Sequence, residues 1–84
     1  MNYETQFADG TIINSYMATG IAEGFEETDE PGDVIRAWSY LIGTKLAYSL
    51  QGWFGRNAQV FISEGIISPD GLVDWDEVYE RLNP

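Results

Sequence analysis

The middle of the chain is rich in apolar side chains and has no acidic residue, whereas the segment before it is densely acidic. Residues 34–63 contain no carboxylate, and six of the fourteen acidic residues fall between positions 23 and 33. Apolar residues in the middle recur at the three- and four-residue spacing of a helix face. Such a chain is expected to fold around a helical core and to carry a negatively charged surface beside it.

The length of 84 residues is enough for one domain, which we assign to residues 1–84 and expect to bury about 60 to 65% of its unfolded surface. Three Trp, five Tyr and four Phe residues are too many for a disordered acidic tail. The sequence has no Cys, no signal-peptide pattern and no apolar run long enough to cross a bilayer. We therefore expect a soluble cytoplasmic protein that folds alone and does not contact membranes.

Helix signals follow one another along almost the whole chain. Apolar periodicity, capping residues and Gly or Pro stops predict helices over residues 11–25, 31–42, 46–51, 54–64 and 75–82. Asp9 or Thr11 would cap the first helix, and Pro31 or Asp33 would open the second. Gly65 would end the helix that begins near residue 54.

The expected fold is all-α, a single compact domain of four to five short helices. The alternation of Tyr3, Thr5 and Phe7 leaves open a minor N-terminal strand. The second helix has one apolar stripe, typical of a helix that packs along a partner helix, made of Val34, Ile35, Trp38, Leu41 and Ile42.

Residues 46–67 have the pattern of a helix-turn-helix-like hairpin. A hairpin that reads DNA needs a basic recognition face, but its second helix offers Arg56 as its one cation beside Asn57 and Gln59. The rest of the chain repels a phosphate backbone. We therefore expect no direct nucleic-acid binding, and the alternatives are an ordinary helical hairpin or a degenerate helix-turn-helix regulator.

Residues 70–77 are similar to the second half of an EF-hand loop, but the first coordinating position of that register is Ile66. The segment is better explained as a turn followed by a capping box of Asp74 and Glu77. Without His or Cys, the common catalytic triads and thiol chemistry are excluded, and solvated neighbours such as Glu26 and Glu27 lack the contrasting environments of an acid and base pair. We expect no enzyme activity, no metal and no cofactor.

The formal charge of -10 predicts a partner with a basic surface, since only four Lys and Arg residues oppose fourteen acids. Carboxylates on a folded scaffold can substitute for phosphates in a nucleic-acid-binding groove. The acidic residues predicted to bind such a partner are Glu23, Glu26, Glu27, Asp29, Glu30, Asp33, Asp70, Asp74, Asp76, Glu77 and Glu80. The alternative is that the acids only keep the domain in solution.

The aromatic residues of the acid-free middle, such as Tyr48 and Phe54, are expected to lie in the core. The alternative is an exposed anchor around Trp53 and Arg56, since Trp, Tyr and Arg dominate the energetic centre of protein interfaces. In that case the protein would be a small interaction or assembly module, and a homodimer stays open.

Residues 37–58 contain the pattern Leu-x-x-Thr-x-x-Ala-x-x-Leu-Gln-Gly-x-x-Gly-Arg-x-Ala. It is made of Leu41, Thr44, Ala47, Leu50, Gln51, Gly52, Gly55, Arg56 and Ala58. This stretch resembles a family of small, functionally unassigned proteins of tailed bacteriophages. The resemblance implies a viral source and transfers no catalytic residue.

Small acidic phage proteins often occupy the nucleic-acid groove of a host protein. From this likeness and the charge we expect a phage-encoded stoichiometric inhibitor of the anti-restriction or anti-CRISPR type, acting in the host cytoplasm. Its partner would be a host nucleic-acid-binding protein such as a nuclease.

Overall fold

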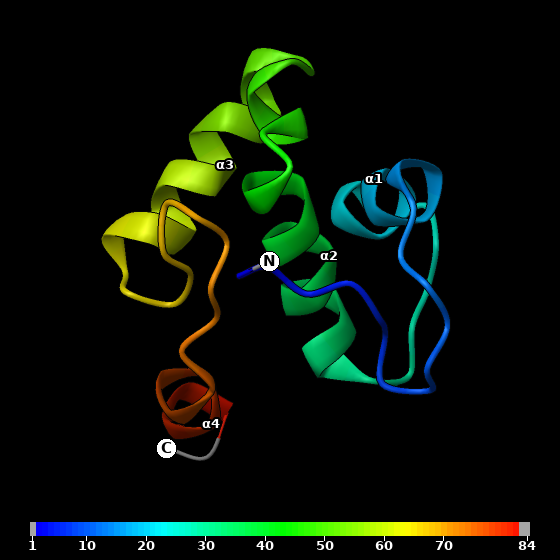
Figure 1. Ribbon diagram of the computed structural model, residues 1–84, viewed down its shortest axis with the longest axis vertical. Coiled ribbons are helices and arrows are strands. Elements are labelled where there is room, and N and C mark those ends of the chain that lie inside the picture. The colour runs from blue at the N-terminus through cyan, green and yellow to red at the C-terminus, as the bar shows by residue number, and fades with distance from the viewer. Residues whose placement is uncertain (1, 83–84) are drawn as a thin grey trace.

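The computed structural model describes residues 2–82, which form four α-helices and one 3-10 turn. The elements are α1 (Ser15–Glu23), α2 (Pro31–Gly43), η1 (Leu46–Tyr48), α3 (Gly52–Ser63) and α4 (Trp75–Leu82). α2 lies in the middle, between α1 and α3, and α4 lies at the end of the molecule where α2 begins (Figure 1). The predicted all-α fold is confirmed. No helix within residues 2–82 has the length and apolar content needed to span a membrane.

The N-terminal strand that the sequence left open does not form in the part of the chain that the structure describes. Gln6 pairs with Ile12 in a single antiparallel bridge, and Ile67 pairs with Val73 in another. Each bridge closes a short turn, so the segments before α1 and before α4 are loops fixed by local hydrogen bonds.

α1 begins later than predicted, because the residues before it form a turn. Asn14 caps the helix, and its side-chain oxygen accepts a hydrogen bond of 2.8 Å from the N–H three residues further on. Asp9 instead accepts from the N–H of Thr11 inside the turn, and hydrogen bonds from the side chain and backbone of Thr11 lower the pKa of Asp9. The helix ends at Gly24, which has a φ of 83°. Phe25 therefore lies outside the helix and is 81% exposed.

α2 is buried on several sides and not along one stripe. Glu30 caps it by accepting a 3.1 Å hydrogen bond from the Gly32 N–H, and Pro31 takes the first helical position, where a missing N–H is harmless. Val34, expected on the stripe, is 36% exposed. The buried residues of α2 are Gly32, Asp33, Ala37, Trp38, Ser39, Leu41 and Ile42. A helix covered in this way is the centre of the domain.

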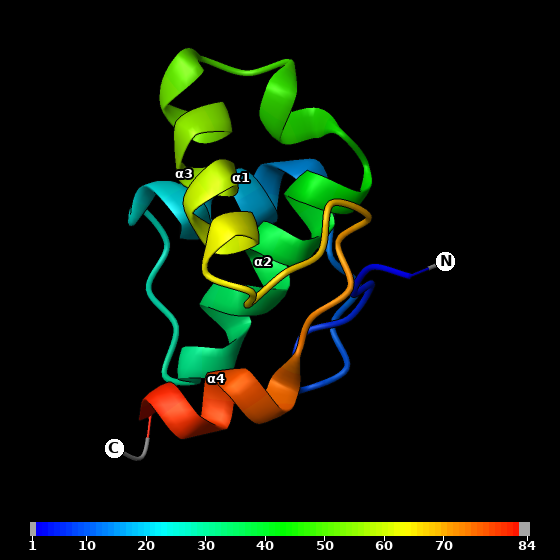
Figure 2. The same ribbon diagram turned by 90° about the vertical axis from the view of Figure 1, so that its left-hand side faces the viewer.

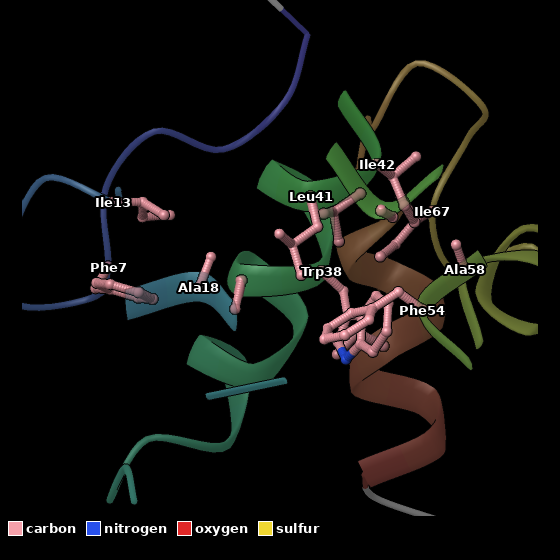
Figure 3. Packing of buried hydrophobic residues seen from close by; sticks show 13 residues of the cluster. Phe7, Ile13, Ala18, Trp38, Leu41, Ile42, Phe54, Ala58 and Ile67 are labelled. Atoms are coloured by element: carbon pink, nitrogen blue, oxygen red, sulfur yellow. The ribbon is translucent and has the colours of Figure 1, made fainter. Parts of the chain in front are cut away.

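α2 divides the core into two parts, as Figure 3 shows. On one side Phe7 and Ile13 of the N-terminal segment gather near Ala18 of α1, and all three are buried. On the other side, three rings of α3 surround Trp38, with centroids 5.9 Å away for Trp53, 6.1 Å for Phe54 and 5.2 Å for Phe61. Aromatic pairs of this kind contribute about 0.5–1.5 kcal/mol each beyond the burial of their area.

The predicted hairpin over residues 46–67 has a different first half. η1 is a single 3-10 turn that follows Lys45, whose φ of 68° is left-handed, so no α-helix forms before the turn. α3 then begins at Gly52, two residues earlier than expected. Gly65 follows the C-cap of α3 in the left-handed conformation, with a φ of 75°. The segment therefore lacks the first helix of a DNA-reading helix-turn-helix.

At the start of α4, one of the two hydrogen bonds of the predicted capping box forms. The Asp74 carboxylate accepts a hydrogen bond of 3.1 Å from the Glu77 N–H. The Glu77 carboxylate does not return this bond but pairs with Arg81 at 3.1 Å. The helix is held against the start of α2 by stacking, because the guanidinium carbon of Arg36 lies 4.6 Å from the centroid of the Trp75 ring.

The N-terminal segment and the loop before α4 meet on α2 at Ser39, which is fully buried. Its hydroxyl donates a hydrogen bond of 2.6 Å to the Gly71 carbonyl and accepts one of 2.9 Å from the Glu4 N–H. Gly71 has a φ of 92°, and a Cβ there would lie 2.8 Å from the Gly43 Cα. Both the backbone conformation and the lack of space require glycine at this position.

Replacing Ser39 with alanine would remove both hydrogen bonds and leave a carbonyl and an N–H unpaired beside the core. We expect the free energy of unfolding to fall by about 2–4 kcal/mol, measured by urea denaturation. Ser63→Ala is the matched control, because the Ser63 hydroxyl is on an exposed residue and bonds only within its own helix. An unchanged urea midpoint for Ser39→Ala would show that this junction does not hold the fold together.

Candidate functional site

Exposed carboxylates gather at the end of the molecule where α2 begins. Figures 1 and 2 show the last part of the loop before α2 and the whole of α4 at this end. The two helices are in contact there, since Pro31, Val34 and Val78 line one apolar hollow between them. We define the acidic end as the exposed carboxylates of this loop and of the α4 segment: Glu27, Asp29, Glu30, Asp74, Asp76 and Glu80.

The Lys and Arg side chains do not neutralise the acidic end. Arg81 of α4 already pairs with two carboxylates, Glu64 at 3.0 Å and Glu77 at 3.1 Å. Arg36 of α2, which stacks on Trp75, pairs with the Asp33 carboxylate at 3.0 Å. Lys45 and Arg56 belong to η1 and α3 segments that lie at the opposite end of the molecule (Figure 1). The field at the acidic end is therefore negative.

Asp33 has a structural position and is not part of this surface. Its carboxylate is only 12% exposed and accepts hydrogen bonds of 2.9 Å from the Ala8 N–H and 3.0 Å from Arg36. The Thr28 hydroxyl lies 3.5 Å from its second oxygen, and Arg36 is also 3.8 Å from Glu4. We therefore remove Asp33 from the acids that a partner could contact.

Four other acids of the predicted set lie apart from the acidic end or are already paired. Glu23 and Glu26 line a groove beside α1. Asp70 lies in the turn after α3, where the Lys45 ammonium donates to the neighbouring carbonyl at 3.1 Å. Glu77 is engaged by Arg81. The structure thus brings six of the eleven predicted acids together. Glu23, Glu26 and Asp70 lie elsewhere, and Asp33 and Glu77 are paired with Arg side chains.

The predicted aromatic anchor lies on the first turns of α3. Trp53 is 40% exposed, and its ring packs edge to face with the Phe54 ring, with 4.9 Å between the two centroids. Arg56 is also exposed on this part of the helix. The prediction that Tyr48 lies in the core is wrong, since it is 44% exposed. The sequence pattern also did not reveal two further exposed rings, Tyr16 and Phe25, which are 79% and 81% exposed. Only the true start and end of α1 could have revealed them.

Within residues 2–82, no three acidic side chains come close enough together to hold a metal ion. The acidic end therefore acts, in the described structure, as a set of separate charges.

A protein-family model described as "Domain of unknown function (DUF7417)" matches residues 21–82. The matched segment includes α2, α3, α4 and every carboxylate of the acidic end. Neither a curated protein nor a solved structure matches the chain.

The buried and the exposed acids of this region should differ sharply in their effect on stability. Asp33→Ala would leave Arg36 without its closest partner and the Ala8 N–H without its acceptor, so we expect a loss of about 3–5 kcal/mol in the free energy of unfolding. Asp29→Ala, four residues away and exposed, should change it by about 0.5 kcal/mol or less. Thermal and urea unfolding of the two variants test this difference, and equal stabilities would mean that the Asp33 contacts are not energetically important.

Proposed function

The chain belongs to the DUF7417 family, and we propose that it is a stoichiometric inhibitor whose acidic end occupies the nucleic-acid-binding groove of another protein by charge mimicry. The observation that carries this proposal is the gathering of six exposed carboxylates on two adjacent elements, with no unpaired Lys or Arg side chain among them in the described structure. A groove lined by Lys and Arg to hold phosphates is the complementary surface.

The fixed backbone of the acidic end supports this proposal. Glu30 and Asp74 cap α2 and α4, which fixes the helix ends that carry the charges. The loop between α1 and α2 is tied down by the Thr28 hydroxyl, which donates a hydrogen bond of 3.5 Å to the Asp33 carboxylate and accepts one of 3.2 Å from the Glu30 N–H. A preorganised array loses little conformational entropy on binding, and its attraction to a basic groove speeds association at low salt.

We further propose a phage source and a host target. Both rest on the resemblance of residues 37–58 to small tailed-bacteriophage proteins, a class that often blocks host nucleic-acid machinery. The target would be a defence nuclease of the restriction or CRISPR type, or another DNA- or RNA-processing protein, in the host cytoplasm.

A second candidate function is a small interaction or assembly module. It is favoured by the exposed first turns of α3, where Trp53 is 40% exposed and held against Phe54. A half-exposed, well-supported Trp beside an Arg is a common energetic centre of protein interfaces. The two candidates use different residues, so the same variants separate them.

The test is capture of host-lysate proteins on the immobilised chain, followed by competition with labelled DNA or RNA for each recovered protein. We expect capture at about 50 mM salt, release by about 500 mM, and loss of nucleic-acid binding at about one chain per target. Asp76→Asn/Glu80→Gln should weaken capture by about 5- to 10-fold.

The matched control is Asp9→Asn/Asp70→Asn, which removes the same charge from positions outside the acidic end. Equal losses in both double variants, or capture that resists salt, would contradict mimicry by the acidic end. If Trp53→Ala abolishes capture and the acidic variants do not, the interaction module is correct.

A further inference from the structure

A second exposed surface lies between the outer face of α1 and η1. It is a groove of about 580 Å³ whose lining includes Tyr16, Glu23, Phe25, Glu26, Leu46 and Leu50. A smaller hollow of about 260 Å³ continues it from Phe25 to Trp53. The two hollows share Glu23 and Phe25, so they form one continuous surface from α1 to the first turn of α3.

The apolar lining of the groove comes from Tyr16 of α1, Phe25 just after it, and Leu46 and Leu50. Ala18 is fully buried towards the core, whereas Tyr16 and Glu23 lie on the opposite face by helical periodicity and line the groove. Tyr16 is 79% exposed and Phe25 is 81% exposed. Large exposed rings grouped around a hollow mark an interaction site more strongly than scattered apolar residues do.

Backbone hydrogen bonds fix the segment after α1 that forms one wall of the groove. The Gly20 carbonyl accepts hydrogen bonds from the N–H groups of Phe25 at 2.9 Å and Glu26 at 3.1 Å. Gly20 also leaves room for the Glu26 side chain to lie on α1, since a Cβ there would be 2.8 Å from the Glu26 Cγ. The backbone that carries the ring and the carboxylate is therefore fixed before any partner arrives.

The charges around the groove decide what it can bind. Glu23 and Glu26 are exposed on its rim, and no Lys or Arg lines either hollow. A second copy of a chain with formal charge -10 would be repelled. Anionic lipid headgroups would be repelled in the same way.

We propose that this groove binds a basic amphipathic helix of a partner protein. Apolar side chains one helical turn apart occupy the space between Tyr16, Phe25 and the two leucines, and flanking Lys or Arg side chains pair with Glu23 and Glu26. The nine residues of α1 span about 13 Å, which matches two to three turns of a docked helix. The surface does not involve the acidic end, so the proposal stands independently of the charge-mimicry function.

The experiment measures binding of a synthetic amphipathic Leu/Lys helix of about 14 residues to the full chain by isothermal titration calorimetry. The comparison peptides are a scrambled Leu/Lys sequence and a Leu/Glu helix. We expect binding of the ordered Leu/Lys helix only, weakened about tenfold or more by Phe25→Ala and about fivefold by Glu23→Gln/Glu26→Gln. Thermal unfolding of each variant shows that it is folded.

Two matched controls separate this groove from general attraction of a basic peptide. Val60→Ala removes an apolar side chain of α3 that is 54% exposed and lines neither hollow, and Asp76→Asn/Glu80→Gln removes two charges from the acidic end. Both should keep the affinity within about twofold. Equal binding of the scrambled peptide, or an equal loss with Asp76→Asn/Glu80→Gln, would overturn the proposal. So would self-association of the chain that Phe25→Ala abolishes, because the occupant would then be a second copy.

Discussion

The burial of α2 on two opposite sides is the constraint on which the rest of the structure depends. α1 and the N-terminal segment cover one side, α3 covers the other, and Ser39 ties the N-terminal segment to the loop before α4. Because the central helix is covered in this way, its two charged residues, Asp33 and Arg36, pair with each other, and most other charged residues lie on the outer elements. The concentration of acids at one end is thus a result of which segments cover α2 and which flank it.

Much of the fold follows from local sequence signals. Pro31 and Asp74 are recognisable helix starts, and both helices begin within one residue of them. The predicted start of α1 is too early, because an Asp side chain that accepts from a nearby N–H occurs in turns as well as at helix starts, and Asp9 forms a turn with Thr11. The position of Asp33 could not be predicted either, because its partner Ala8 is distant in sequence and presents only a backbone N–H.

The site shows the same division between local and long-range information. Clustering of acids before α2 is visible in the sequence, but whether Asp29 and Asp76 share an end depends on the packing of α4 against α2. The exposure of Tyr16 and Phe25 depends on where α1 begins and ends, and the apolar periodicity of residues 11–25 did not predict these ends. The acidic end and the groove border the same loop, so one short segment separates two surfaces of different chemistry.

The Ser39 junction also determines when the chain can fold. It joins Glu4 to Ser39 and Ser39 to Gly71, pairs that are 35 and 32 positions apart in the sequence. A nascent chain has neither the carbonyl of residue 71 nor α4 until those residues have been synthesised, so its central helix stays incompletely covered up to that point. The junction can therefore close only after the segment around Gly71 has been added to the chain.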